Sequence, residues 1–198
     1  HEHIKQNTRK IKKWYKEIYY FKKQINVHEH INKKIRKRGI WIMKFGALYS
    51  YWGHEWKCDY IETAKRMHAC GCEVLEVGAP HLLEMTDDQL KELKTTCDEL
   101  EMEITSNIGP SKEYDLASED PAVRANGVKY LTDILRAMKK IGSKSLVGAM
   151  YSYWPCKDFK YDDKEGAWER SIQGMKEVAK VAEELDIECC LEVLNRFE

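Results

Sequence analysis

Two glutamates in apolar, strand-like runs are the residues of this sequence best suited to chemistry. Glu76 lies in the run EVLEVG at 73–78, and Glu192 lies in CCLEVLN at 189–195. A carboxylate inside an apolar strand is costly to bury unless it is paired, protonated or bound to a metal ion. This favours metal ligation or base catalysis for Glu192. Glu76 could equally be a satisfied polar residue that contacts a neighbouring strand.

Aromatic side chains follow two of the apolar runs. The quartet Tyr-Ser-Tyr-Trp occurs at 49–52 and again at 151–154, and the turn Asn-Ile-Gly-Pro-Ser-Lys occupies 107–112. Aromatic walls and a few polar groups are a common way to build a pocket for a sugar or another small ligand. Ordinary packing beneath loops is the equally weighted alternative for any one of these aromatic residues.

The elements that must position these residues alternate between short apolar runs and longer amphipathic stretches. This alternation is typical of repeated βα units with parallel strands. A Thr-x-x-Gln capping box at 86–89, an early proline at Pro121 and a glycine at Gly142 mark helix ends. We predict strands at 43–49, 73–78, 103–107, 144–150 and 188–194, and helices at 57–70, 86–100, 119–141 and 164–185.

Five strands and four helices at this spacing predict an α/β fold, the first part of an eight-stranded (β/α)8 TIM barrel, truncated after its fifth strand. The runner-up is a doubly wound open sheet, but no glycine-rich phosphate-binding sequence follows the first strand. In a barrel, the loops that follow the strands form the active-site face. The polar and aromatic residues at the strand ends would therefore meet there.

The first 42 residues differ from the remainder in composition. They hold 13 Lys and Arg against 3 Asp and Glu, although the whole chain has no formal net charge. The first methionine is Met43. We interpret 1–42 as a translated leader or a non-native basic arm, and 43–198 as the barrel domain. Nucleic-acid binding by the arm is the weakest interpretation, because no groove-reading motif accompanies the charge.

The seven cysteines are odd in number and irregularly spaced, which is a poor pattern for a disulfide framework. The pair Cys70 and Cys72 is spaced too tightly for a zinc knuckle, so structural thiols in a reducing cytosol are expected. No apolar stretch is long enough for a membrane span or a signal peptide. We expect a soluble cytoplasmic protein that contacts no membrane.

Residues 43–198 resemble the D-tagatose 3-epimerase and D-psicose (allulose) 3-epimerase family of ketose epimerases, within the xylose-isomerase-like barrels. The similarity runs in family order through several short pieces, of which the closing LEVLNRFE is the most specific. These pieces are MKFG at 43–46, YSYW at 49–52 with Glu55 and Trp56, EVLEV at 73–77, IGPSK at 108–112, SED at 118–120, Gly148 and Ala149 with SYWP at 152–155, and LEVLNRFE at 191–198.

The resemblance implies a role for each matching residue. Glu192 would ligate a divalent metal, Mn²⁺ first with Co²⁺ or Mg²⁺ as alternatives, and exchange the proton on C3 of a ketose. Glu198 would hydrogen-bond the substrate hydroxyls near that carbon. The remaining candidates line the pocket, and two of them depart from common family patterns. These pocket-lining candidates are Trp154, Trp56, Ala149, Asn107 and Leu48. The two departures are Leu48, where an aromatic residue is frequent in the family, and Asn107, where a small residue is frequent.

The resemblance also implies that the other metal ligands, an Asp, a His and an opposing Glu, belong to later strands. We therefore expect the chain as given to be inactive, and the full-length protein to be a homo-oligomer. Three alternatives remain open: a related barrel enzyme of the hydroxypyruvate isomerase type, a non-catalytic sugar-binding module that needs no metal, and the basic-arm nucleic-acid binder.

Overall fold

The computed structural model describes residues 43–53, 55, 57–156 and 163–195, so the predicted basic arm at 1–42 lies outside the described residues. The described residues form an alternating series of strands and helices. In chain order these are β1 (Gly46–Leu48), α2 (Tyr60–Ala69), β2 (Val74–Gly78), α3 (Ala79–Leu82), α4 (Asp87–Glu99), β3 (Glu103–Ile108), the 3-10 turn η1 (Lys112–Tyr114), α5 (Pro121–Ile141), β4 (Ser145–Gly148), α6 (Lys164–Leu185) and β5 (Glu188–Leu191).

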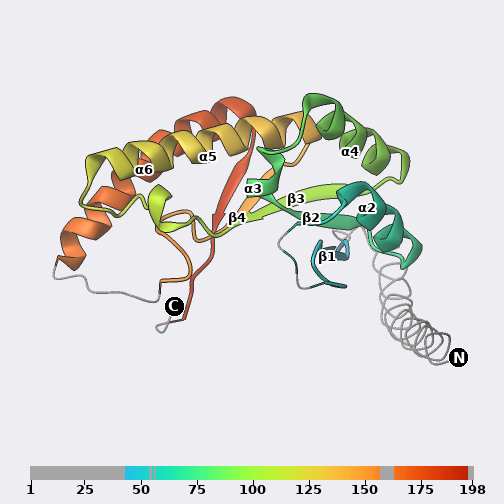
Figure 1. The fold of residues 1–198 in the computed structure, drawn as a ribbon, viewed down its shortest axis with the longest axis horizontal. Helices are drawn as coiled ribbons and strands as arrows, with labels where there is room; N and C mark the ends of the chain where they lie inside the picture. The colour runs from blue at the N-terminus through green and yellow to red at the C-terminus, as the bar shows by residue number, and fades with distance from the viewer. Residues whose placement is uncertain (1–42, 54, 56, 157–162, 196–198) are drawn as a thin grey trace, which may run out of the picture.

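The five strands form one parallel sheet in which sequence order and spatial order coincide, β1-β2-β3-β4-β5. Helices α4, α5 and α6 form a layer along one face of the sheet (Figure 1), and α2 packs against α4 and β2. A doubly wound sheet would reverse its strand order and carry helices on both faces. The observed order is that of a partial (β/α)8 barrel, which confirms the predicted fold class.

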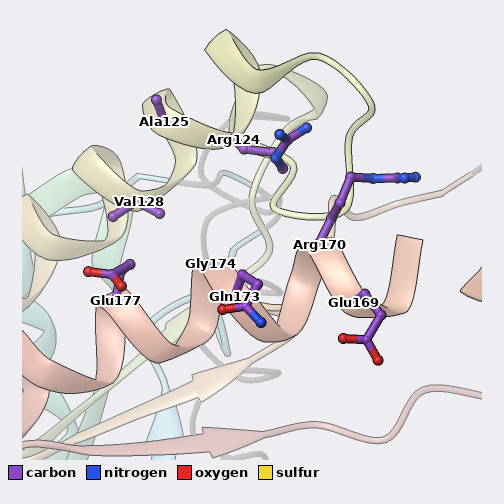
Figure 2. Close-up of a pocket in the computed structure, with 8 residues that line it drawn as sticks. All are labelled: Arg124, Ala125, Val128, Glu169, Arg170, Gln173, Gly174 and Glu177. Carbon is purple, nitrogen blue, oxygen red and sulfur yellow. The ribbon is translucent and has the colours of Figure 1, made fainter. Parts of the chain in front are cut away.

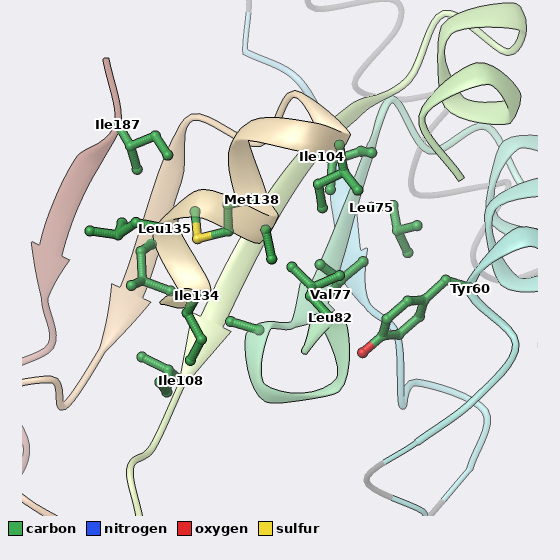
Figure 3. Packing of buried hydrophobic residues seen from close by; sticks show 14 of the residues in the cluster. Tyr60, Leu75, Val77, Leu82, Ile104, Ile108, Ile134, Leu135, Met138 and Ile187 are labelled. Atoms are coloured by element: carbon green, nitrogen blue, oxygen red, sulfur yellow. The ribbon is translucent and has the colours of Figure 1, made fainter. Parts of the chain in front are cut away.

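The hydrophobic core lies between the sheet and the helices. Alternate strand residues point toward the helical layer, and Leu75, Val77 and Leu146 are all fully buried. Figure 3 shows Leu75 and Val77 of β2 and Leu135 and Met138 of α5 as members of one hydrophobic cluster. Because side chains alternate along a strand, burying this set turns the intervening residues to the opposite face of the sheet.

That opposite face, called the inner face below, carries no helix among the described residues. The register brings its residues into rows, since directly paired residues of parallel strands point to the same side. Leu48 pairs with Glu76, and Asn107 pairs with Gly78 on one side and Val147 on the other. Val147 in turn pairs with Cys190 of β5. The candidate site residues of three strands therefore share one face.

The predicted helix ends agree with the structure to within a few residues. Thr86 forms the predicted capping box with Gln89, and Gly142 adopts a left-handed φ of 75° as the C-cap of α5. Helix α5 starts at Pro121 rather than at residue 119, because Asp120 accepts a hydrogen bond from the N–H of Ala122 and caps the helix. The short elements α3 and η1 were not predicted from the sequence.

The two outer strands of the described sheet are shorter than predicted. β1 starts at Gly46 rather than at residue 43, and β5 ends at Leu191 rather than at residue 194. Each of them pairs with a single neighbour among the described strands, so fewer ladder hydrogen bonds extend it. Glu192 therefore follows β5 directly instead of lying within it.

All seven cysteines are free thiols, as expected from their spacing. Burial raises the pKa of Cys72 and of Cys97 to about 11.

Among helices of the described residues, none combines the length and the apolar composition that a membrane-spanning segment requires.

Candidate active site

The loops that follow β3 and β4 are joined at the carboxyl end of the sheet. The main-chain N–H of Trp154 donates a 2.7 Å hydrogen bond to the carbonyl of Pro110. The Trp154 ring lies against Gly109 so closely that a Cβ there would stand 2.8 Å from its Cε3. Trp154, a predicted pocket residue, is therefore held at the strand ends by the turn after β3.

Glu192 continues the sheet for one residue beyond β5. Its N–H donates to the carbonyl of Gly148 at 3.1 Å, and its own carbonyl accepts from the Tyr151 hydroxyl at 3.0 Å. Tyr151 is held in turn by Ser171 of α6, whose hydroxyl donates to the Tyr151 carbonyl at 2.7 Å. Three elements therefore fix the backbone at Glu192.

The side chain of Glu192 is exposed, in contrast to the burial that its apolar sequence context suggested. The apolar neighbours Leu191 and Val193 are themselves 50% and 95% exposed. The reason is that β5 is an outer strand of the described sheet, so its side chains lack a neighbour on one side. Glu192 thus combines a fixed backbone with an accessible carboxylate.

Gly148 allows β4 to approach β3 at the site. Its φ is +140°, and a Cβ at this position would stand 2.0 Å from the carbonyl oxygen of Ile108. The next residue, Ala149, donates its N–H to the same carbonyl at 3.3 Å and is 4% exposed. A glycine is required here because any side chain would push the two strands apart.

Glu76 and Asn107 are in contact on the inner face. The Asn107 Nδ2 donates a 3.0 Å hydrogen bond to the Glu76 Oε1, and both residues are half-buried. The contact confirms that Glu76 is a satisfied polar residue meeting a neighbouring strand, one of its two predicted roles. Leu48, the register partner of Glu76, is 39% exposed on the same face. Leu48 and Asn107 are therefore brought together around Glu76.

Sequence reasoning missed a tyrosine that fixes the end of β2. The Tyr60 hydroxyl donates to the carbonyl of Gly78 and accepts from its N–H, both at 3.0 Å. Burial is the main cause that raises the pKa of Tyr60, so this hydroxyl stays protonated. The Tyr49 ring lies edge-on at 5.6 Å between centroids. A tyrosine in the first turn of a helix gives no local signal for such a long-range contact.

Two predicted site residues, Trp56 and Glu198, lie outside the described residues. Within the described part of the chain, no group of three or more His, Cys, Asp or Glu side chains could hold a metal ion. A divalent metal ion of the expected kind takes several oxygen and nitrogen ligands. Glu192 fits the role of one such ligand, since its carboxylate is accessible, but the described residues do not complete a metal site.

A cavity of about 390 Å³ lies between α5 and α6 (Figure 2). Its arginines are engaged by the fold: Arg124 donates to the carbonyl of Ser118 at 2.7 Å, and Arg170 donates to the carbonyl of Ala117 at 2.9 Å. None of the predicted site residues lines it. The lining residues are Arg124, Ala125, Val128, Glu169, Arg170, Gln173, Gly174 and Glu177.

The class of protein is that of a (β/α)8 TIM barrel. Its strands are in sequential order, its helices form a layer on one face of the sheet, and a candidate glutamate lies at the end of β5. The family model of the xylose isomerase-like TIM barrel matches residues 62–198, and the chain belongs to this family. It is 42% identical over 156 residues to D-psicose 3-epimerase of Ruminiclostridium cellulolyticum, and 37% identical over 156 residues to D-psicose 3-epimerase of Agrobacterium fabrum.

The aligned region covers 79% of this chain, and the chain spans about half the length of these curated relatives, 53% and 54%. A crystal structure of D-psicose 3-epimerase with D-tagatose from Clostridium cellulolyticum H10 superposes with a TM-score of 0.76 at 42% identity. The superposition covers 79% of this chain and 54% of that chain. The similarity is therefore to one part of a ketose epimerase barrel.

Proposed function

We propose that this chain is part of a ketose 3-epimerase that inverts C3 of a free ketohexose such as D-fructose or D-psicose. The proposal depends most on Glu192. Its backbone is fixed by hydrogen bonds to Gly148 and Tyr151, while its carboxylate remains accessible. Support comes from relatives named D-psicose 3-epimerase at 37% and 42% identity.

In the proposed reaction Glu192 is the base on one face of the sugar. Its carboxylate takes the proton from C3, and the electrons of that C–H bond move toward the C2 carbonyl to give an enediolate. An acid on the opposite face then returns a proton to C3, which inverts the centre. This opposing group is not among the described residues. The inner-face residues Leu48 and Asn107, with Ala149 and Trp154, would bind and orient the ketose.

The same proposal includes a divalent metal ion, with Mn²⁺ as the first choice and Co²⁺ or Mg²⁺ as alternatives. When bound, such an ion polarises the ketose oxygens and offsets the negative charge that develops on them. Glu192 would supply one ligand, and the others would come from outside the described residues. Trp56 and Glu198 would complete the substrate contacts, with Glu198 near the reacting carbon.

A small-molecule ketose would be the partner, and the full-length protein would be a homo-oligomer. Seven free thiols support a reducing compartment, and we propose the cytoplasm. Residues 1–42 would be a translated leader or a non-native basic arm.

The test is to express the full reading frame that contains this chain from Met43 and to assay D-fructose for its C3 epimer with added Mn²⁺. The matched variants are Glu192→Gln and Glu188→Gln, both on exposed glutamates at opposite ends of β5. We expect metal-dependent epimer formation that Glu192→Gln abolishes and that Glu188→Gln leaves within about twofold of the original rate, because only the first removes the proposed base.

Removal of the metal with EDTA should stop turnover, and Mn²⁺, Co²⁺ and Mg²⁺ should restore it to different extents. Full activity of Glu192→Gln would remove Glu192 from the mechanism. A protein that binds ketoses tightly without metal and turns none of them over would be a sugar-binding module instead.

A further inference from the structure

The proposed reaction uses Asn107 as a ketose-binding residue but gives no role to Glu76, which contacts Asn107 on the inner face. We propose that Glu76 is a positioning residue: it fixes the side-chain amide of Asn107 so that the amide oxygen accepts a hydrogen bond from a ketose hydroxyl remote from C3. The inference rests on the proposed function and extends it to the choice among ketoses.

The contact follows from the sheet register. Asn107 pairs directly with Gly78, and Glu76 lies two residues before Gly78 on the same strand. Residues two apart on a strand point to the same side, so both side chains lie on the inner face. Diagonal neighbours on adjacent strands are within reach of long side chains, and here the Nδ2 to Oε1 distance is 3.0 Å.

The chemistry of the pair determines which way the amide points. An ionised carboxylate only accepts hydrogen bonds, whereas an asparagine amide offers donors on its nitrogen and an acceptor on its oxygen. Glu76 therefore engages the nitrogen and turns the Asn107 Oδ1 away from itself. Among the described residues, none donates a hydrogen bond to this oxygen. It is an oriented acceptor on a face that no described helix covers.

The position of Asn107 separates its role from that of Glu192. The two residues belong to β3 and to the end of β5, with β4 between them. Two strand spacings amount to about 10 Å. A ketose with C3 at the Glu192 carboxylate would thus present a hydroxyl of its far end to Asn107. The proposal assigns this contact equal strength in the substrate complex and in the transition state, and the loss of such a contact raises KM and leaves kcat unchanged.

A double-mutant cycle in the full reading frame tests the proposal. Glu76→Ala and Asn107→Ala should each raise KM for D-fructose about fivefold to tenfold, the usual effect of losing one hydrogen bond, with kcat within about twofold. If Glu76 acts through Asn107, the double variant should be no worse than Asn107→Ala alone. Additive effects on KM, or losses confined to kcat, would overturn the proposal.

A second pair of variants covers the case in which Glu76→Ala fails to fold. Asn107→Asp places two carboxylates in contact and should raise KM strongly. Combining Asn107→Asp with Glu76→Gln restores the hydrogen bond in the opposite direction: the new amide on β2 donates to the new carboxylate on β3. The second oxygen of that carboxylate then faces the substrate as an acceptor, so KM should return to near the original value. Failure of this rescue in a variant with an unchanged melting temperature contradicts the positioning role.

Failure of the proposed function is recognised separately. If no ketose is epimerised, the side-chain amide signal of Asn107 is followed by ¹⁵N–¹H NMR during titration with D-fructose. A shift that Glu76→Ala abolishes supports the positioning of Asn107 in a sugar-binding site. A signal that D-fructose does not move overturns the proposal.

Discussion

The hydroxyl of Tyr151 donates a 3.0 Å hydrogen bond to the main-chain carbonyl of Glu192, 41 residues further along the chain. This bond ties the loop after β4 to the residue that follows β5. It holds the candidate base by its backbone, and leaves the Glu192 carboxylate unobstructed.

Tyr151→Phe should therefore loosen Glu192 without removing any ring packing. We expect the free energy of unfolding to fall by about 1 kcal/mol, the usual net contribution of one hydrogen bond. In the full reading frame, kcat for D-fructose should fall severalfold, because the proton-abstracting group is held less well. Steady-state kinetics and urea unfolding measure the two effects.

The control for this change is Tyr130→Phe, a hydroxyl deletion on α5 where the ring stacks on Tyr114 at 3.8 Å between centroids. It should leave kcat unchanged. Equal losses of kcat in Tyr151→Phe and Tyr130→Phe would show that the Tyr151 bond has no special connection to the site.

Gly148→Ala should be among the most damaging single changes in the described region. The new Cβ would stand 2.0 Å from the Ile108 carbonyl oxygen at a φ of +140°. Both the clash and the backbone strain add to the cost, which we expect to be about 3 kcal/mol or more. The measurement is urea unfolding followed by circular dichroism.

Gly142→Ala is the matched control, because Gly142 has a φ of +75° but the nearest side-chain atom, Lys94 Cε, would lie 3.6 Å from the new Cβ. Strain alone should cost about 1 kcal/mol there. If Gly148→Ala and Gly142→Ala lower the free energy of unfolding equally, then the close approach of β3 and β4 is not the reason that position 148 requires glycine.

Thr86→Ala should remove the N-terminal cap of α4. The Thr86 hydroxyl accepts from the N–H of Gln89 at 3.3 Å, and the Gln89 side chain accepts from the N–H of Thr86 at 2.8 Å. Loss of such a cap costs about 1 kcal/mol. Thr95→Ala, at an exposed position inside the same helix, should be neutral or slightly stabilising because alanine has the higher helix propensity. Thermal unfolding distinguishes the pair.

The thiols should differ in reactivity according to how deeply each is buried. Cys190 is exposed, whereas Cys97 is 1% exposed and burial raises its pKa to about 11. A pKa raised in this way leaves about one thiolate in a thousand at about pH 8, and the fraction grows as the pH rises toward the pKa. With Ellman's reagent at this pH, the 198-residue chain should show a fast phase from Cys190, and Cys97 should react only on unfolding.

Cys190→Ser should remove the fast phase, and Cys97→Ser should leave it intact. A fast phase that survives Cys190→Ser would mean that another thiol is the accessible one. Reaction of Cys97 in the folded chain under the same conditions would contradict its burial on the core-facing side of α4.

Most elements of the fold were predictable because their signals are local. The capping box at Thr86 and the C-cap at Gly142 each depend on hydrogen bonds within a few residues, so sequence patterns report them directly. The short helix α3 was missed because four residues carry too little periodicity to detect. The strands were overestimated at β1 and β5, each of which pairs with one described neighbour, and also at β4, which ends at Gly148 rather than at residue 150.

The sequence by itself determined the alternation of strands and helices, the family and the identity of Glu192 as the leading candidate. Only the tertiary structure decided that Tyr151 meets the Glu192 backbone and that Glu76 contacts Asn107. The physical reason is that these partners lie 41 and 31 residues apart. Their contact depends on strand register and on which face of the sheet the helices cover, and neither is encoded in any short stretch of residues.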